Sequence, residues 1–198
     1  MSIILQKIHR KSTRWKNGGG STVEVIVVPT GAGFDDFDWR ISLATIAQSG
    51  SFSVFPGIDR TLVLVDGGGL ALQIDAAPPF NLHPGQPLIR FRGEAAVDAT
   101  LASGATTDFN VMTRRSTCSH QVEMLTFSGS HRLTRRSGST LLFLAGGDRL
   151  TCRHGEKDTL LHLHDALLLT ADDAAEWTLQ AAATVTLFIA HITENSND

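Results

Sequence analysis

Short apolar or alternating runs, separated by turn residues, recur along almost the whole chain and constrain its fold most. The runs are bounded by clusters of Gly, Pro, Asp and Asn, a pattern typical of antiparallel strands joined by tight turns. None of the runs is long enough to predict an amphipathic helix. The predicted strands cover residues 22–28, 39–47, 52–55, 61–65, 70–74, 88–91, 96–100, 121–127, 140–144, 160–164, 166–170, 176–180 and 184–191. The sequence therefore predicts an all-β protein.

A faint internal repeat indicates how these strands are divided. TLVLVDGGGL (residues 61–70) aligns with TLLFLAGGDR (residues 140–149), each a strand followed by a glycine turn. Gene duplication explains the match, although strands ended by Gly-Gly are common enough to match by chance. We expect a double jelly roll (bicupin) of short antiparallel strands, because two packed jelly rolls limit exposed strand edges. The two halves, residues 1–115 and 116–198, would form a single compact unit.

Composition excludes several classes of partner. The chain has 17 Lys and Arg against 20 Asp and Glu, and its basic residues are scattered, so we expect no nucleic acid as partner. Its two cysteines, Cys118 and Cys152, form no CxxC pair, which disfavours disulfides and thiolate zinc sites. The N-terminal apolar run is short and precedes its basic residues, and no run approaches the roughly 18 apolar residues of a membrane span. We therefore expect a cytoplasmic protein without membrane contact.

A glycine-rich segment, NGGGST (residues 17–22), permits two interpretations. The backbone N–H groups of Gly18, Gly19 and Gly20, with Asn17 beside them, would form a nest for an anion. Alternatively, the segment is a bulged entry into the strand at 22–28, where only glycine fits. It is not a Walker motif, because the lysine is missing and a strand follows.

The pair His162 and His164 would place two imidazoles on one face of a strand, as some metal sites require. Such a site also needs a nearby carboxylate, but residues 167–169 are all Leu. The alternative is two solvent-facing histidines. We therefore expect no metal and no cofactor.

Two arginines are candidate anion contacts. Arg40 alternates with Ile41 and Leu43, so its side chain would point into a barrel. An ion pair with Glu24 or Asp38, or simple exposure, is the alternative for Arg40.

Arg60 follows the Pro56-Gly57 turn at the mouth of the strand at 61–65. A guanidinium in that position can hold a carboxylate with two parallel hydrogen bonds.

The segment DFNVM (residues 108–112) supplies an amide, an aromatic ring and a thioether together. Asn110 would pair with a carbonyl or formyl group, and Phe109 and Met112 would wall it. A turn in the core, with Asn110 bonded to backbone groups, is the alternative.

Taken together and in order, four segments resemble the HutD/Ves family: WKNGGGSTVE (15–24), WRIS (39–42), FSVFPGIDRTL (52–62) and DFNVM (108–112). The resemblance implies a cupin-like fold of two barrels without a catalytic metal. It also implies an association with histidine-utilisation enzymes and N-formylglutamate as a ligand. Two carboxylates and a formyl amide are chemically compatible with the arginines, glycine N–H groups and Asn110, although citrate or a sugar acid would be served as well.

The leading hypothesis is a non-enzymatic protein that binds a small anionic metabolite, modulates histidine utilisation and is compatible with a homodimer. The candidate ligand-binding residues are Arg60, Arg40, Asn17, Gly18, Gly19, Gly20, Ser53, Phe109, Asn110 and Met112. The main alternative is a cupin-type hydrolase or isomerase acting on a small acidic metabolite, with His83, His162 or His164 in its site. A protein-interaction module with apolar barrel ends is the third hypothesis.

Overall fold

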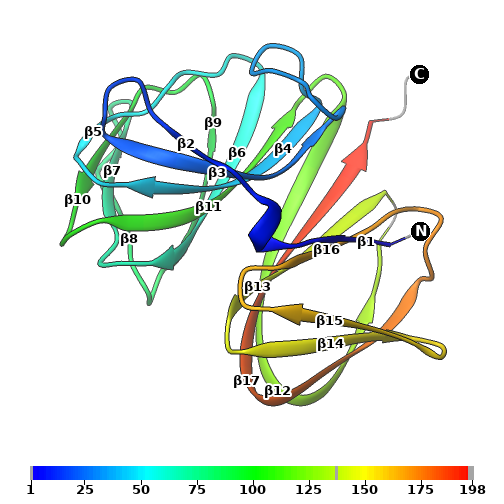
Figure 1. Cartoon of the computed structure of the whole chain (residues 1–198). Coiled ribbons are helices and arrows are strands. Elements are labelled where there is room, and N and C mark those ends of the chain that lie inside the picture. The colour runs from blue at the N-terminus through cyan, green and yellow to red at the C-terminus, as the bar shows by residue number, and fades with distance from the viewer. Residues whose placement is uncertain (1, 137, 196–198) are drawn as a thin grey trace. The chain divides into compact units, whose positions relative to one another are not determined.

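The computed structural model describes residues 2–136 and 138–195, and these form two units. The N-unit runs from Arg10 to Cys118, and the C-unit combines the residues up to His9 with those from Ser119 onward. Apart from one short 3-10 helix, η1 (Lys7–His9), the regular elements in these ranges are β-strands (Figure 1). The all-β prediction is therefore confirmed.

The N-unit contains two antiparallel sheets. One has the strand order β2-β3-β4-β11-β6-β9 and the other has the order β5-β10-β7-β8. The strands are β2 (Ser12–Arg14), β3 (Gly20–Val28), β4 (Trp39–Ile46), β5 (Gly50–Ser51), β6 (Ile58–Asp66), β7 (Leu70–Ile74), β8 (Phe80–Leu82), β9 (Leu88–Arg92), β10 (Val97–Leu101) and β11 (Thr106–Arg114). In Figure 1 they run from blue to green.

The inner faces of these two sheets share one hydrophobic core. Leu62 and Leu64 on β6 belong to the same buried cluster as Leu72, Leu82 and Ala99 on the smaller sheet. Because side chains alternate between the two faces of a strand, this cluster identifies the inner face of β6. Every second residue from Leu62 therefore points into the N-unit.

The C-unit is built on one sheet with the order β1-β16-β13-β17-β14-β15, and β12 pairs with β17. Its strands are β1 (Ile3–Leu5), β12 (Cys118–Thr134), which begins one residue before the unit, β13 (Ser139–Gly146), β14 (Arg149–His154), β15 (Lys157–His162), β16 (Ala166–Leu169) and β17 (Glu176–Glu194). The core cluster described for this unit consists of apolar side chains, including Leu142, Leu167 and Trp177.

The observed division differs from the 1–115 and 116–198 halves at the N-terminus. The residues up to His9 join the C-unit because β1 pairs with β16, with Ile4 opposite Leu167. The backbone N–H of Lys7 also donates to Asp165 Oδ1 over 2.7 Å. A three-residue strand satisfies its backbone groups only at an existing sheet edge, and sequence alone does not show which edge that is.

Individual strands also differ from prediction. Residues 52–55 form no strand, whereas the predicted strands at 176–180 and 184–191 are parts of the 19-residue β17. The predicted strand at 121–127 extends to the 17-residue β12, so these two strands are not short. The repeated segments occupy matching local positions: β6 and β13 end near Gly67 and Gly147, which have φ of 97° and 90° and lead into β7 and β14.

A search of the described residues found no helix with the length and apolar character needed to span a membrane.

Candidate ligand site

The register of β11 brings three polar side chains onto the inner face of the N-unit. On β6, Leu64 lies opposite Asp108, and Arg60 lies opposite Met112. Asn110 occupies the row between them on β11. Since Leu64 is a core residue, Arg60, Asp108 and Asn110 all point into the N-unit.

These three polar side chains are buried and incompletely hydrogen-bonded. The exposed fractions are 7% for Arg60, 1% for Asp108 and 7% for Asn110. Arg60 Nε, Asp108 Oδ1 and Asn110 Oδ1 have no hydrogen-bond partner. Buried polar groups in folded proteins are almost always paired, so three such atoms on one inner face indicate a place for a ligand or water.

Three phenylalanine rings surround the guanidinium of Arg60. Its Cζ lies 5.0 Å from the ring centre of Phe91 and 5.5 Å from those of Phe52 and Phe55. Phe91 is the register partner of Arg60 on β9, whereas Phe52 and Phe55 come from the irregular segment before β6. Aromatic faces attract the cation while they exclude water from it.

Burial dominates the electrostatics of this site. It lowers the pKa of Arg60 to about 10, although the negative charge of Asp108 partly opposes the change. Burial also raises the pKa of Asp108 to about 7, and the nearby Arg60 opposes this rise. In the described structure the two side chains form no ion pair with each other. Asp108 therefore changes charge near neutral pH in the interior of the N-unit, which also holds a cation.

Arg40 lies on the same face as Met112 but has its own partner. Arg40 Nε donates to Glu24 Oε2 over 3.0 Å, and its guanidinium lies 4.4 Å from the ring centre of Phe34. Of the alternatives considered from sequence, the ion pair with Glu24 is the one that the structure contains. Arg40 is thus not an unpaired cation that awaits an anion.

Phe34 and Phe55 connect this ion pair to the Arg60 site. Their ring centres are 5.6 Å apart, and Phe34 is 56% exposed. A chain of ring contacts therefore links the exposed Phe34 through Phe55 to the Arg60 guanidinium.

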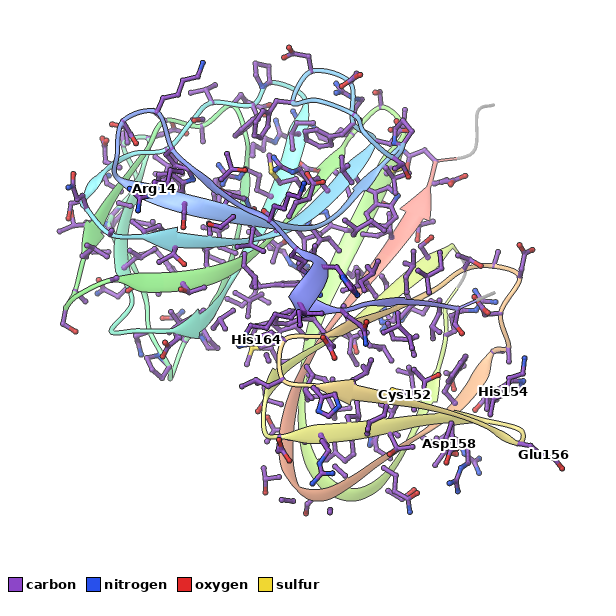
Figure 2. All side chains as sticks on the ribbon, in the orientation of Figure 1. Arg14, Cys152, His154, Glu156, Asp158 and His164 are labelled. Carbon is purple, nitrogen blue, oxygen red and sulfur yellow. The ribbon has the colours of Figure 1, made fainter. Side chains whose placement is uncertain are left out.

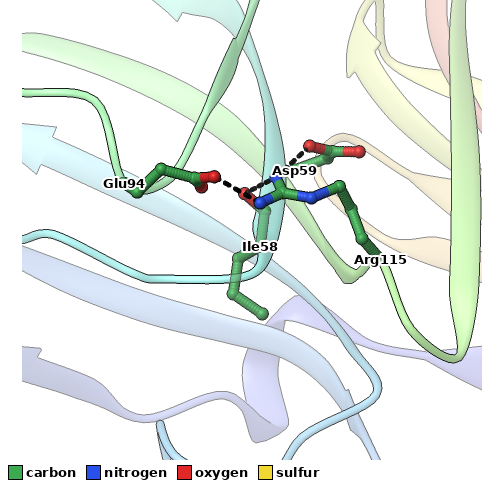
Figure 3. A network of polar contacts seen from close by, with 4 residues as sticks. All are labelled: Ile58, Asp59, Glu94 and Arg115. Carbon is green, nitrogen blue, oxygen red and sulfur yellow. Dashed lines mark hydrogen bonds and ion pairs between the residues drawn. The ribbon is translucent and has the colours of Figure 1, made fainter.

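Arg115 anchors the start of β6, the strand that carries Arg60 (Figure 3). Its Nη1 donates to the carbonyl of Ile58 over 3.1 Å and to Asp59 Oδ1 over 2.6 Å. Its Nη2 donates to Glu94, beyond the end of β9. Arg115 therefore ties β6 to the turn after β9 and fixes the position from which Arg60 points into the N-unit.

Gly93 positions Phe55 by a close backbone approach. The N–H of Phe55 donates to the carbonyl of Gly93, and the N–H of Gly93 donates to the carbonyl of Ile58, both over 2.7 Å. A Cβ atom at Gly93 would lie 2.5 Å from the carbonyl oxygen of Phe55. Only glycine permits this approach, which holds the Phe55 ring near Arg60.

The glycine-rich segment does not form the anion nest predicted for it. The N–H of Gly18 donates to the carbonyl of Trp15, and the N–H of Gly19 donates to Asn17 Oδ1, both over 3.0 Å. A Cβ at Gly20 would lie 2.3 Å from the carbonyl oxygen of Thr45. The segment is therefore a strand entry that needs glycine, as the alternative interpretation held.

A pocket of about 60 Å³ lies beside this strand entry. Its lining residues are Trp15, Asn17, Gly19, Ile46, Gln48, Ser49, Gly50, Ser51 and Phe52. Asn17 and Gly19 therefore line a neighbouring pocket. Phe52 is the residue that this pocket shares with the aromatic wall of the Arg60 site.

Three further predicted positions are corrected. Phe109 lies opposite Val63, on the strand face away from Asn110, because neighbouring residues of a strand point to opposite faces. Ser53 is exposed on the irregular segment before β6. Arg60 is buried within the N-unit rather than standing at the mouth of a strand. Met112 shares the inner face with Asn110.

The histidines do not form the strand pair considered above. β15 ends at His162, and His164, labelled in Figure 2, follows in a turn with φ of 71°. The ring of His164 stacks on that of Phe143, with ring centres 5.7 Å apart. His83 lies in an exposed turn of the N-unit, where its ring accepts the N–H of Gly85. Within the described ranges, no group of three or more His, Cys, Asp or Glu side chains could hold a metal ion.

Cys152 (Figure 2) is fully buried in the C-unit core, and burial raises the pKa of its thiol to about 12. A thiol with so high a pKa holds little thiolate at neutral pH and is chemically inert.

Sequence reasoning missed Asp108 and the aromatic wall. Asp108 belonged to a segment already singled out, and its spacing of two residues from Asn110 placed it on the same strand face. The sequence indicated the aromatic wall more weakly, through Phe52 and Phe55 at the two ends of the FSVF segment. Nothing in the sequence connected Phe91 with them.

Comparisons with known proteins find relatives that match most of this chain. The chain is 36% identical over 159 residues to an uncharacterised 21.2 kDa protein in the hutC 3' region of Pseudomonas putida, covering 80% of this chain and 82% of that protein. It is also 36% identical over 168 residues to protein Ves of Citrobacter koseri, covering 82% and 76%. The equal identities do not separate a hut-associated branch from a Ves branch.

Solved structures show the same fold. A conserved protein of unknown function from Pseudomonas aeruginosa PAO1 aligns with a TM-score of 0.89 at 28% identity, over 97% of this chain and 98% of that chain. HutD from Pseudomonas fluorescens SBW25, solved in a formate condition, aligns with a TM-score of 0.82 at 25% identity, over 99% and 100%. Escherichia coli Ylba, at 10% identity and a TM-score of 0.72 over 100% and 93%, supports a cupin-like fold alone.

The HutD family model matches residues 7–188, a range that includes the Arg60 site and most of both units. This chain therefore belongs to the HutD family, which is associated with the histidine-utilisation locus.

Proposed function

We propose that this protein is a non-enzymatic receptor for a small carboxylate metabolite and modulates histidine utilisation through its occupancy. The observation that carries this proposal is the buried guanidinium of Arg60, enclosed by aromatic rings, with Nε lacking a partner. A buried charge without a partner is costly, and a carboxylate is the group that best satisfies a guanidinium.

The neighbouring Asn110 supports a ligand that carries a hydrogen-bond donor as well as a carboxylate. Asn110 Oδ1 lacks a hydrogen-bond donor, and the N–H of a formyl amide is such a donor. N-formylglutamate, or a similar small dicarboxylate, combines both features and remains the candidate ligand. The link to histidine utilisation rests on family membership and on the location of the P. putida relative.

Calorimetric titration of the full chain with formate, acetate, glutarate and N-formylglutamate tests the proposal. Arg60→Met should weaken binding by about 10- to 100-fold, the loss expected for one or two charge-assisted hydrogen bonds. Arg60→Lys keeps the charge but loses the planar fork, so its affinity should be intermediate. The matched control is Arg14→Met, which removes an exposed arginine from β2 of the same unit and should leave the affinity within about twofold.

Two results would overturn the proposal. If the parent binds none of these acids at millimolar concentration, the ligand is not a carboxylate. If the parent and Arg60→Met bind with equal affinity, Arg60 is not part of the site. Thermal melts of each variant establish that the fold is intact.

An enzyme remains the second candidate, because a carboxyl group with a pKa near 7 suits a general acid. The histidines considered for it do not support it: His83 is in an exposed turn, and His162 and His164 belong to the other unit. Incubation with N-formylglutamate, followed by proton NMR, separates the two functions. If the parent releases formate and Asp108→Asn does not, the protein is a hydrolase and not a receptor.

A further inference from the structure

We propose that anion binding beside Arg60 is coupled to the uptake of one proton by Asp108, which makes Asp108 the residue that sets the charge selectivity of the site. This inference rests on the proposed carboxylate site and adds a mechanism to it. The observations that carry it are the burial of both side chains, the unpartnered oxygen of Asp108, and the absence of an ion pair between them in the described structure.

Charge balance gives the reason. With the site empty, the cation of Arg60 and the anion of Asp108 sum to zero inside the N-unit. A carboxylate that binds Arg60 adds a second negative charge to a region where water is excluded. Buried charges of one sign interact strongly at low dielectric, so the acid that can accept a proton will do so.

Among the described residues around Asp108, no other charged group could take up the proton in its place. Its register neighbours are Ala44 on β4 and Leu64 on β6, and Thr22 follows Ala44 in the same row on β3. The smaller sheet contributes the aliphatic residues Leu70, Leu72, Leu82, Val97 and Ala99 to the core.

Arg40 and Glu24, which share this face, hold each other in an ion pair, and Asp66, two residues beyond Leu64 at the end of β6, is exposed. Arg60 is accordingly the charged group that acts on the pKa of Asp108.

Protonation also changes the hydrogen-bonding role of Asp108. As a carboxylate it only accepts hydrogen bonds, but as an acid it donates one. An occupied site therefore offers donors from Arg60 and Asp108 and an acceptor from Asn110. This arrangement favours a ligand that presents one carboxylate and a neutral polar group, and it disfavours one that presents a second negative charge to Asp108.

The pKa of Asp108, about 7 without ligand, means that this proton is available at physiological pH. A bound anion raises the pKa of Asp108 further, because it offsets the attraction of Arg60 and repels the Asp108 carboxylate. Affinity should therefore fall as pH rises above 7, toward a limit of tenfold per pH unit.

Calorimetry with sodium formate and acetate, which stay ionised between pH 6 and 9, tests the coupling. At pH 7.5 each titration is repeated in buffers of low and high ionisation enthalpy, and the difference in observed heat gives the number of protons taken up. We expect between about half and one proton per bound anion, and a Kd about tenfold or more higher at pH 8.5 than at pH 6.5.

Asp108→Asn should abolish proton uptake and make the Kd vary by less than about twofold over this range, because the amide imitates the neutral acid. The control is Asp66→Asn, which changes an exposed acid at the end of β6 and should retain the coupling. Thermal melts establish that both variants are folded.

The outcomes separate this inference from the proposed function. Binding by the parent without proton uptake, or uptake that persists in Asp108→Asn, overturns the coupling and leaves the receptor proposal in place. Failure of the parent to bind any of the anions overturns the receptor proposal and the coupling with it.

Discussion

Arg60 and Asp108 lie on the inner faces of the adjacent strands β6 and β11, yet in the described structure their buried charges do not meet in an ion pair. A folded core gains little from such an arrangement, because burial penalises both charges and the attraction between them only partly offsets it. The cost is consistent with a site retained for binding rather than for stability.

The first prediction concerns the stability of the ligand-free protein. The folded pKa of Asp108 lies near 7 against 3.8 for the free side chain, so the folded state holds this proton more tightly. Its contribution to stability is full below about pH 4 and is lost as pH rises to about 7, by on the order of 4 kcal/mol. Urea unfolding of parent and Asp108→Asn at pH 5 and 8 measures the part of this loss that falls between these pH values, about 2.5 kcal/mol. The same pH dependence in both proteins would contradict it.

The second prediction concerns removal of the buried cation. Arg60→Met removes the attraction that holds the pKa of Asp108 down, so this pKa should rise further. At pH 5.5, where Asp108 is already neutral, the variant should be as stable as the parent or more so. At pH 8.5 it should lose about 1–3 kcal/mol relative to the parent, because a buried carboxylate is left without a counter-charge. A uniform loss at both pH values would show that Arg60 acts through packing alone.

The third prediction concerns the anchor in Figure 3. Arg115→Met removes hydrogen bonds to the carbonyl of Ile58 and to Asp59 and Glu94, and should cost about 1–2 kcal/mol of unfolding free energy. It should also weaken carboxylate binding, because β6 positions Arg60. Arg14→Met, the exposed control, should change the stability by less than about 0.5 kcal/mol. If Arg115→Met and Arg14→Met change stability and binding equally, Arg115 does not anchor β6.

The fourth prediction concerns Arg40 and Glu24. Their side chains are 13% and 43% exposed, so this ion pair is partly screened by solvent. A double-mutant cycle with Arg40→Met and Glu24→Gln should give a coupling free energy of about 1 kcal/mol, reduced at 0.5 M salt. A coupling of 3–5 kcal/mol would instead indicate a fully buried pair.

The sequence allowed prediction of the strand class and of three residues near the site. Alternating runs ended by glycine turns predicted strands that match β6 and β13, because side-chain alternation is a local property of the backbone. Asn110, Met112 and Arg60 were identified from segments that do converge on the inner face of the N-unit. The segment 52–55 was predicted wrongly as a strand: Phe52 and Phe55 each donate one backbone hydrogen bond to a neighbouring segment but form no continuous ladder, and their rings contribute to the wall around Arg60.

Local sequence by itself determined that residues 108–112 and 58–66 are extended and which residues within each share a face. Only the tertiary structure decided that Asp108 and Arg60 face the same buried interior, that Arg40 is taken by Glu24, and that the Gly18 and Gly19 amides are used within their own loop. The physical reason is that burial and hydrogen-bond pairing depend on strand register and on which segments meet across a sheet. Those contacts join residues tens of positions apart, so no local pattern specifies them.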